Sequence, residues 1–579
     1  MVRATFAGFS TALSALQANQ KRLDITGQNL SNMNTVGYTR QQLDVSSLNY
    51  SGGVSHNMNG AEAVVGFGVR MDGVSQLRDP YLDMQYRLQM AKADYSNGLQ
   101  TGLDALSNVL DESKISGLRQ AFADIQSSLT AMQESQNAHD PVYEGELRTR
   151  MQALATLLNQ SSVQISEAEK AGFDRISGNG TSEQGAVEKI NDILRQVGDL
   201  NVRIKQNQVA GQPSLELMDE RNNLLDTLSS YVPIEVTSYK DGSHSGTYTY
   251  TAPDGTTSQR DYAYDYDAHG RIIGKRQWPE DVRVDLVYTD ANGAVQKLNL
   301  VNGSDRGADG MQKNYGQLEA LKASDGAAPD RSTPTDLAVR FTAAQSGAVN
   351  PDGTPAQAPA ITAAANGAQF SGGSLQAELD MLGKTGTGAV IAGTATKDDV
   401  RGYQFYQNEL DKLASAFAKK INDLNKAGQG GILLTDKTQA ADTETGITAS
   451  NIGVSAGWTN GSVHIGNGTN SSADTVVNML EAMKKPQGDL DDNTYADYMN
   501  HIAAQLATDS SANQTALKTN VTVLNAIQNS KDSVSGVSLD EEAANMMTYV
   551  SAYNAASRLM TALDEVLNTL ISNTGLVGR

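Results

Sequence analysis

The triplet Gly383-Lys384-Thr385 is the part of the sequence that most resembles a phosphate-binding loop. Such a loop holds phosphate with backbone N–H groups and a lysine, and it needs a glycine five positions before its last glycine. Glu378 occupies that position here. A second glycine pair, Gly66 and Gly68, is followed by Met71 where a dinucleotide-binding loop has its third glycine. Both segments are better interpreted as ordinary surface structure than as nucleotide sites.

Calcium ligation is suggested by Asp489, Asp491 and Asn493, whose alternate spacing matches the start of a calcium-binding loop. That loop also needs a glycine at its turn and a glutamate at its end, where this sequence has Thr494 and Asn500. Cysteine is absent, which excludes thiolate chemistry. The six histidines are scattered singly, at His56, His139, His244, His269, His464 and His501. The sequence therefore predicts a protein that is not an enzyme and that needs no metal or cofactor.

The size and charge of the chain exclude further classes of function. With 579 residues the chain is too long for one core, so we expect several domains. A net charge of -21 repels phosphate backbones and anionic lipids, which argues against nucleic acid and membrane partners. No apolar run is long enough for membrane insertion, and the N-terminus lacks the features of a cleaved signal peptide.

Instead of a catalytic cluster, the two ends of the chain carry heptad stripes of apolar residues. The N-terminal stripe consists of Phe6, Phe9, Leu13, Leu16, Leu23 and Leu30. The C-terminal stripe consists of Leu539, Met546, Tyr549, Tyr553, Ala556, Met560, Leu563, Leu567 and Leu570. Side chains at this spacing share one face of a helix, and a lone amphipathic helix has nothing to pack against. We expect the two helices to pair as a coiled coil or to pack on neighbouring copies; completing a core within one monomer is the alternative.

Between the ends the hydrophobic period changes twice. Helical spacing predicts helices from Asp79-Pro80 to about 110 and near 116–133, 142–171 and 185–208. Alternating tyrosines and turn signals such as Asn292-Gly293 predict an antiparallel β region over about 234–310, and another strand covers Leu337 to Thr342. Within this region, 240–310 is expected to fold independently, with its ends close together. Helical spacing returns at 403–424, 473–485 and 493–531.

These periods predict an α+β multidomain fold in which a β region is inserted between helices. The terminal helices form an axial coiled-coil domain, residues 1–35 with 536–579. A mainly helical, bundle-like domain with short β segments covers 36–233 with 395–535, and a β-rich outer domain covers 234–394. Two local signals mark the borders. Gly37 is expected to adopt a positive φ in the turn after the first helix, and Ser538 with Glu541 forms a predicted capping box before the last helix.

Both borders lie in segments that resemble a known family. Residues 16–32, followed by Asn34-Thr35-Val36-Gly37-Tyr38-Thr39-Arg40-Gln41, resemble the N-terminal motif of bacterial flagellar rod, hook and hook-associated proteins. The C-terminal segment 534–546, with Ala552-Tyr553-Asn554-Ala555, is similar to the closing motif of the hook-associated proteins of the hook–filament junction. Leu217-Met218-Asp219-Glu220-Arg221 resembles a further motif of these junction proteins, although Asn222 stands where aspartate is usual. The resemblance covers about 1–236 and 395–579.

This resemblance implies a structural role in flagellum assembly and motility. Proteins of this family leave the cytoplasm through the flagellar type III export apparatus without a cleaved signal peptide, and assemble helically outside the cell as a zone between hook and filament. The implied partners are other copies of the chain, the hook protein, the second hook-associated protein and an export chaperone that binds the C-terminal helix. The resemblance also places Asn29, Asn32, Gly37 and Tyr38 in the assembly interface, together with the two stripes.

Two alternative functions are considered. A hook-type axial protein would share the terminal motifs, but Leu539-Asp540-Glu541-Glu542 and the long helical stretch 80–208 argue against it. A secreted adhesin or surface hydrolase could use flagellar ends for export and act through residues 237–394. Clustered catalytic residues in that segment would favour this alternative, and the sequence shows none there.

Overall fold

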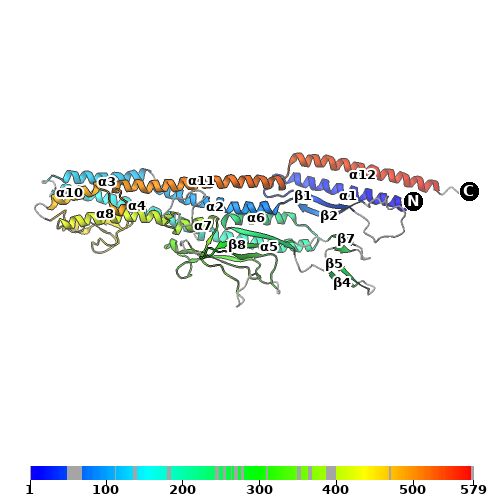
Figure 1. The fold of residues 1–579 in the computed structure, drawn as a ribbon, viewed down its shortest axis with the longest axis horizontal. Helices are drawn as coiled ribbons and strands as arrows, with labels where there is room; N and C mark the ends of the chain where they lie inside the picture. Colours follow the sequence, from blue (N-terminus) through cyan, green and yellow to red (C-terminus); the bar gives the residue numbers. More distant parts are fainter. Residues whose placement is uncertain are drawn as a thin grey trace.

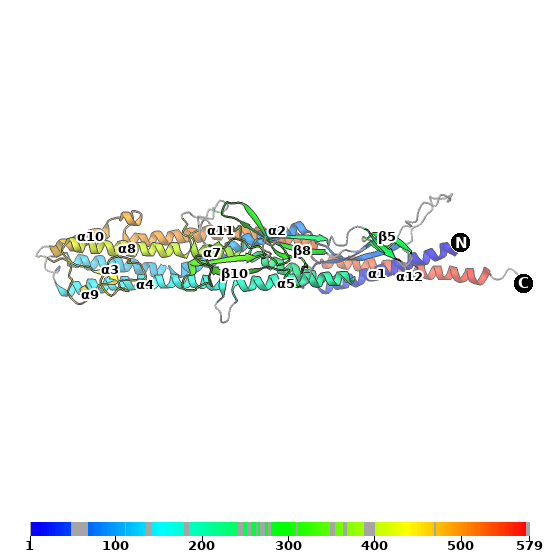
Figure 2. The same cartoon turned by 90° about the horizontal axis from the view of Figure 1, so that it is seen from below.

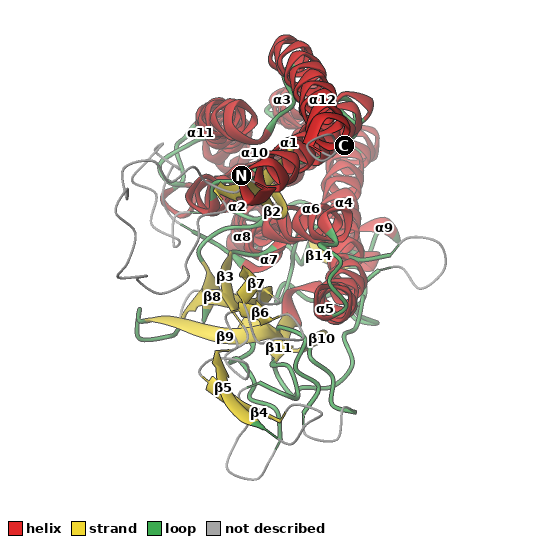
Figure 3. Ribbon diagram, turned by 90° about the vertical axis from the view of Figure 1, so that its right-hand side faces the viewer, coloured by secondary structure: helices red, strands yellow, loops and turns green. Residues whose placement is uncertain are grey.

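The computed structural model of the chain describes most of its length. The described residues are 2–47, 68–110, 112–134, 138, 140–178, 184–240, 247–251, 256–261, 264–266, 272–275, 280–307, 311–347, 354–362, 368–386, 400–467 and 471–574. The molecule is elongated, and both termini lie at the same end (Figure 1). Viewed along its length, the strands gather mainly on one side of the helices (Figure 3).

The helices account for most of the described residues. They are α1 (Val2–Ser31), α2 (Pro80–Val109), α3 (Glu112–Met132), α4 (Pro141–Ser177), α5 (Ala186–Val209), α6 (Leu215–Tyr231), α7 (Ser374–Gly383), α8 (Tyr403–Ala427), α9 (Ala456–Thr459), α10 (Ser471–Lys484), α11 (Tyr495–Ser535) and α12 (Leu539–Thr574). Two 3₁₀ turns span Pro334–Asp336 and Gly488–Leu490. The predicted helices are therefore confirmed, with ends that differ by a few residues.

The strands form several small antiparallel sheets. They are β1 (Gln41–Ser47), β2 (Val69–Gln76), β3 (Ile234–Lys240), β4 (Thr247–Thr251), β5 (Thr257–Asp261), β6 (Tyr264–Tyr266), β7 (Ile272–Lys275), β8 (Glu280–Thr289), β9 (Val295–Asn302), β10 (Gln317–Lys322), β11 (Leu337–Thr342), β12 (Ile361–Thr362), β13 (Gln369–Phe370), β14 (Leu434–Asp436) and β15 (Ile452–Val454). The predicted α+β class is confirmed. The boundaries of the three predicted domains remain a prediction.

The terminal pair, α1 with α12, extends from one end of a longer body (Figures 1 and 2). In the body, α11 packs against α2 and α3, and α7 lies buried between α2 and α4. Capping side chains explain where the long helices begin: Asp79 accepts from the amide of Tyr81, and Asp140 accepts from that of Val142. Each aspartate is followed by a proline, whose missing N–H costs nothing in the first turn of a helix.

The distal part of the body is held by an aromatic cluster. The ring of Phe122 on α3 packs edge-to-face on Phe417 of α8, at a centroid distance of 5.4 Å, and stacks on Tyr495 of α11 at 5.9 Å. All three side chains are buried. Helices that are far apart in the sequence therefore share one core, as the nested arrangement requires. Among the described residues, no helix is both long enough and apolar enough to cross a membrane.

The expectation that 240–310 folds independently is wrong. Strand β8 lies at the centre of its sheet, where it pairs with β3, β9 and β13, and Val284 and Leu286 on β8 are fully buried in the main core. Helix α5 packs against β8 and β9, and Asn201 on α5 donates to the carbonyl of Val282 at 3.1 Å. Removing these two strands would open the body's own core.

A shorter segment, 241–279, meets the two conditions that 240–310 fails. Lys240 and Glu280 are direct partners in the β3–β8 register, so the chain leaves β3 and enters β8 at adjacent positions. The hairpins β4–β5 and β6–β7 fall inside this segment. In the described sheets each hairpin is a separate two-stranded sheet. Of the predicted tyrosine row, Tyr262 and the side chains of Tyr264 and Tyr266 lie outside the described residues.

Replacing 241–279 with Asn-Gly should leave the body intact, because a two-residue turn of this type joins paired strands without strain. We expect unchanged helical circular dichroism and a melting midpoint within about 3 °C of the parent, a difference of about 1 kcal/mol or less. The matched variant lacks 240–310 and should lose much of its cooperative unfolding. Equal melting of both variants would contradict the placement of β8 and β9 in the body's core.

Candidate assembly interface

Helices α1 and α12 lie side by side over most of their length, which confirms their predicted pairing (Figure 1). The most buried apolar residues of α1 are Ala12, Ala18 and Ile25. At Gly8 the helices come especially close, since a β-carbon there would lie 3.4 Å from both Cδ atoms of Leu563. Small residues on α1 allow the two backbones to approach, while the larger side chains come mainly from α12.

The predicted N-terminal stripe lies beside this contact line rather than along its centre. Leu13 is 45% exposed, and the side chain of Phe6 lies outside the described residues. The other members are partly buried: Phe9, Leu16, Leu23 and Leu30. The stripe therefore faces α12 with one edge only, and its other edge is open to a further partner.

The predicted C-terminal stripe lies along the contact line more closely. Ala556 is buried, and partial burial is shared by Met546, Tyr549, Tyr553, Met560, Leu563, Leu567 and Leu570. Leu539, at the start of the helix, is 53% exposed. Apolar side chains beyond the stripe are also exposed, among them Met547 at 68%, with Val550, Leu559, Val566 and Ile571. One α1 helix thus leaves much of the apolar surface of α12 uncovered.

The turn after α1 depends on Gly37. Its φ of +78° confirms the predicted positive value, and this left-handed conformation is strained for residues with a side chain. A β-carbon at Gly37 would lie 2.0 Å from Nδ2 of Asn223 on α6, so the backbone passes directly against that helix. Gly37 therefore fixes how closely the turn approaches the body.

Asn29 holds the turn to both helices of the terminal pair. This side chain is almost fully buried. Its Oδ1 accepts from the Tyr38 hydroxyl at 2.9 Å and from the Gln41 amide at 3.0 Å, and its Nδ2 donates to the Gln41 carbonyl at 2.9 Å and to Glu542 at 3.4 Å. Burial, together with the negative charges of Asp219 and other nearby acids, raises the pKa of Tyr38 to about 12, so its hydroxyl stays a donor. Asn32 has only local partners.

Arg40 joins the same turn to the start of α12. Its side chain donates to Glu541 at 2.6 Å and to Glu542 at 2.8 Å, and its backbone amide donates to the Ser535 carbonyl at 2.8 Å. Only half of the predicted capping box is present: Ser538 Oγ accepts from the Glu541 amide at 3.5 Å, but the Glu541 carboxylate pairs with Arg40. An acid at the N-terminal end of a helix is favourable in any case, so the pairing of Glu541 with Arg40 could not be predicted from the sequence.

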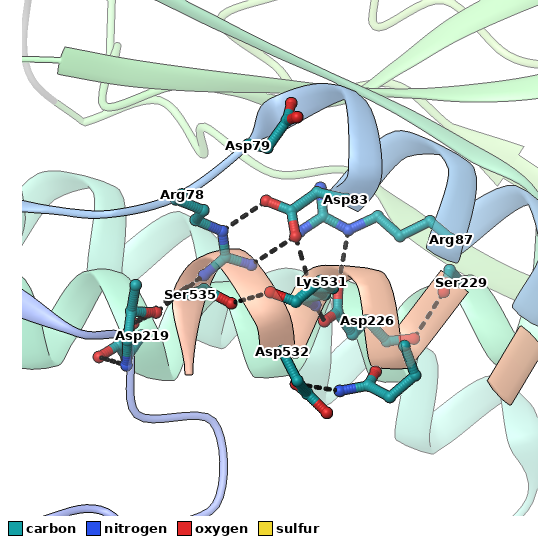
Figure 4. Close-up of polar contacts among 12 residues, drawn as sticks. Arg78, Asp79, Asp83, Arg87, Asp219, Asp226, Ser229, Lys531, Asp532 and Ser535 are labelled. Carbon is teal, nitrogen blue, oxygen red and sulfur yellow. Dashed lines mark hydrogen bonds and ion pairs between the residues drawn. The ribbon is translucent and has the colours of Figure 1, made fainter. Parts of the chain in front are cut away.

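A group of charged residues continues from this turn into the body (Figure 4). Thr39 donates to Asp219 on α6 through its hydroxyl at 2.6 Å and its amide at 3.1 Å. Arg78, just before α2, lies 3.9 Å from Asp219 and donates to Asp83 at 3.0 Å. Sequence reasoning missed the contacts of Asp219, because they join residues about 140 to 180 positions apart.

Helices α2, α6 and α11 then meet around two further cations. Lys531 on α11 lies 3.3 Å from Asp83 and 2.8 Å from Asp226, and Arg87 on α2 donates to Asp226 at 2.7 Å (Figure 4). Burial acts to raise the pKa of Asp83, but its hydrogen bond to Arg78 and the nearby positive charges outweigh burial, so the pKa is lowered. Asp83 therefore stays ionised and paired.

The segments first considered for ligand binding have structural roles here. Gly383 ends α7, and the buried Lys384 pairs with Asp380 at 3.5 Å. Asp491 pairs with Lys412, and the Asn493 amide donates to backbone carbonyls rather than presenting an oxygen to a cation. In the part of the chain that the structure describes, no three acidic or histidine side chains gather closely enough to hold a metal ion.

Family models match three parts of the chain. Residues 103–249 match the flagellar hook-associated protein FlgK helical domain, residues 9–39 match the flagella basal body rod protein, and residues 528–573 match the flagellar basal body rod FlgEFG protein C-terminal. The two rod-type matches fall on α1 with its turn and on the end of α11 with α12, which form the interface described above. The chain is thus a structural member of the axial proteins of the bacterial flagellum.

The relatives narrow this class further. The flagellar hook-associated protein 1 of Bacillus subtilis (strain 168) is 26% identical over 597 residues, covering 99% of each chain. That of Salmonella typhimurium is 28% identical over 253 residues, which cover 42% of this chain and 41% of the relative. The solved structure of the flagellar hook junction protein FlgK from Burkholderia pseudomallei is 17% identical, with a TM-score of 0.38, and covers 61% of this chain and 46% of that one. This chain belongs to the flagellar hook-associated protein 1 (FlgK) family, whose role is structural and not enzymatic.

Replacing Gly37 with alanine should destabilise the turn for two separable reasons. The positive φ costs roughly 1–2 kcal/mol, and the clash with Asn223 adds to it. Gly211→Ala is the matched control, because Gly211 has a φ of +83° and open space where the β-carbon would lie. Thermal unfolding of Gly37→Ala should show a larger loss than that of Gly211→Ala. Adding Asn223→Ala should recover the difference; equal losses in the two single variants would contradict the close approach.

Proposed function

We propose that this chain forms the junction zone between hook and filament by helical self-assembly. The observation that supports this best is that the terminal pair buries only one side of each heptad helix. Several apolar side chains of α12 stay exposed on a single subunit, among them Met547, Val550, Leu559 and Val566, distributed along the helix outside its contact with α1. Exposed apolar side chains that gather on one element favour a protein–protein interface there. Neighbouring copies offer the same surface and can cover it.

The proposed interface consists of the two terminal stripes and the turn that follows α1. It includes Asn29, Asn32, Gly37 and Tyr38 because these residues set the direction in which α1 leaves the body. The body and the outer β region would then lie further from the assembly axis, with boundaries near 35, 233, 394 and 536. Residues 241–279, which branch from the β3–β8 pair, belong to the part that needs no axial contact.

The further partners are proposed from the family. In the junction zone the chain contacts the hook protein on one side and the second hook-associated protein on the other. It reaches this position outside the cell through the flagellar type III export apparatus, without a cleaved signal peptide. Before export, a chaperone that covers the exposed face of α12 would keep subunits apart in the cytoplasm. The net charge of -21 supports protein partners over nucleic acid or membranes.

Neither alternative function is supported by a specific observation. The match of 103–249 to the FlgK helical domain covers α4, α5 and α6, the region that argued against a hook-type protein. The described part of 237–394 contributes strands β8 to β11 to the common core, as a structural element would.

Leu563→Asp should abolish incorporation into the flagellum while the body stays folded. A carboxylate at this partly buried position against Gly8 of α1 is taken out of water and costs up to several kcal/mol. The matched control is Ala562→Asp, one residue away on an exposed position of the same helix. Motility, filament counts and the amount of the chain in sheared flagella measure the effect. Normal filaments on cells with Leu563→Asp, or equal loss in both variants, would contradict the proposed interface.

A further inference from the structure

Eight charged side chains alternate in sign across the root of the terminal pair, which we define as the region where α1 ends, α12 begins and both meet the body. The series begins on α12, passes through the turn after α1, and ends on α2 inside the body. Its members, in order, are Glu542, Arg40, Asp219, Arg78, Asp83, Lys531, Asp226 and Arg87. Each is an ion-pair partner of the next, except that Arg40 connects to Asp219 through Thr39, the residue before it. We call this series the charge bracket.

All eight groups are well buried. No member's side chain is more than 17% exposed, and that of Glu542 is only 3% exposed. Desolvating eight charges is expensive, so apolar residues of similar size would serve stability at least as well. Buried ion pairs do something that apolar contacts do not, because they tolerate only one arrangement of their partners. The charge bracket is therefore better explained by a need for a fixed geometry than by a need for stability.

The charge bracket acts beside a small set of other contacts between these elements, among them the Asn29 hydrogen bonds and the close approach of Gly37 to Asn223. Between α11 and α12 the chain leaves helical structure at Gly536, and between α1 and β1 it passes through the turn at Gly37. Two backbone hydrogen bonds cross the root: Arg40 donates to Ser535, and Leu77 donates to Arg40. Exposed apolar residues in this region, such as Val36, contribute no packing. Of the contacts between residues far apart in the sequence, the ion pairs, together with the Thr39 hydrogen bonds, are the ones that run continuously from α12 through the turn to α2 and α11.

We propose that the charge bracket fixes the direction of the terminal pair relative to the body. Its members would act as positioning residues for assembly, a role that rests on the proposed function. A subunit whose terminal pair points in one direction can present α12 and the body to its neighbours together. A subunit whose terminal pair moves relative to the body could make the same contacts, but it would lose more conformational entropy each time it joins the assembly.

The absence of cysteine makes a direct test possible, because introduced cysteines can be labelled without background. Spin labels at Asn97→Cys on α2 and Ala555→Cys on α12 occupy exposed positions, 17 and 16 residues from the starts of their helices. Helical rise places them roughly 50 Å apart along the molecule, on opposite sides of the root. Double electron–electron resonance on the purified subunit measures the distance distribution. The parent should give a single narrow maximum.

Arg78→Gln and Arg40→Gln should each lose that single maximum, since each removes a cation between two acids. Lys419→Gln is the control, because it breaks an exposed ion pair with Asp423 far from the root. The triple variant Arg40→Glu with Glu541→Arg and Glu542→Arg restores opposite charges in both pairs and should recover the narrow maximum. If a single variant fails to fold by circular dichroism, this swap still decides.

A narrow maximum retained in folded Arg78→Gln and Arg40→Gln would overturn the proposal, and so would a swap that folds but stays broad. Because the measurement uses separate subunits, it does not depend on whether they assemble. A broad maximum in a variant that still builds normal filaments would support the positioning role in the free subunit. Incorporation lost in Leu563→Asp alone would address the proposed function instead.

Discussion

The first and last helices of this chain bury their apolar faces mainly against each other, and α1 also packs against β1 and β2. This pairing brings residues more than 500 positions apart into contact, as between Asn29 and Glu542. The chain between them must then leave the end of α1 and return to the start of α12 at the same place in the molecule. The body does this with α2 leading away from the terminal pair and α11 leading back along it. The β region is inserted in sequence between α6 and α8.

The pairing of α1 and α12 within one subunit leaves part of their apolar surface unburied. Small residues of α1, such as Ala12 and Ala18, allow close contact but bury little area, and α12 keeps several large apolar side chains exposed. Covering the rest of five such side chains would be worth on the order of 5 kcal/mol for each subunit, since a full burial is worth about 1.5–3 kcal/mol per residue. That gain becomes available only when copies meet. In the proposed assembly, the apolar side chains that a single subunit leaves exposed would supply this gain.

The sequence predicted those parts of the structure that depend on local pattern. Heptad spacing indicated the pairing of the ends, alternation indicated β11, and Gly37 indicated a turn with positive φ. The sequence did not predict which side of α1 faces α12. The stripe was assigned from the large apolar residues, whereas the closest contact between the helices is made at a small residue, Gly8. The placement of β8 was also missed, since burial by α5 is a long-range effect.

The charge bracket could not be found from the sequence for a similar reason. The chain has 66 acidic residues, and nothing near Asp83 or Asp226 distinguishes them from acids on the surface. Only the fold brings Arg87 from α2 and Lys531 from α11 together around Asp226. The family motifs did mark Arg40 and Asp219, but as positions in a pattern and not as members of one network.

The central claim is that the exposed face of α12 is covered by neighbouring copies. Hydrogen exchange of residues 539–574 tests it most directly, measured on the purified subunit and on assembled flagella. The account predicts that α1 and α12 exchange much more slowly after assembly, whereas α4 and α8 in the body change little. Equal protection of α12 in both states would contradict it, because the face would then remain open to solvent in the assembly.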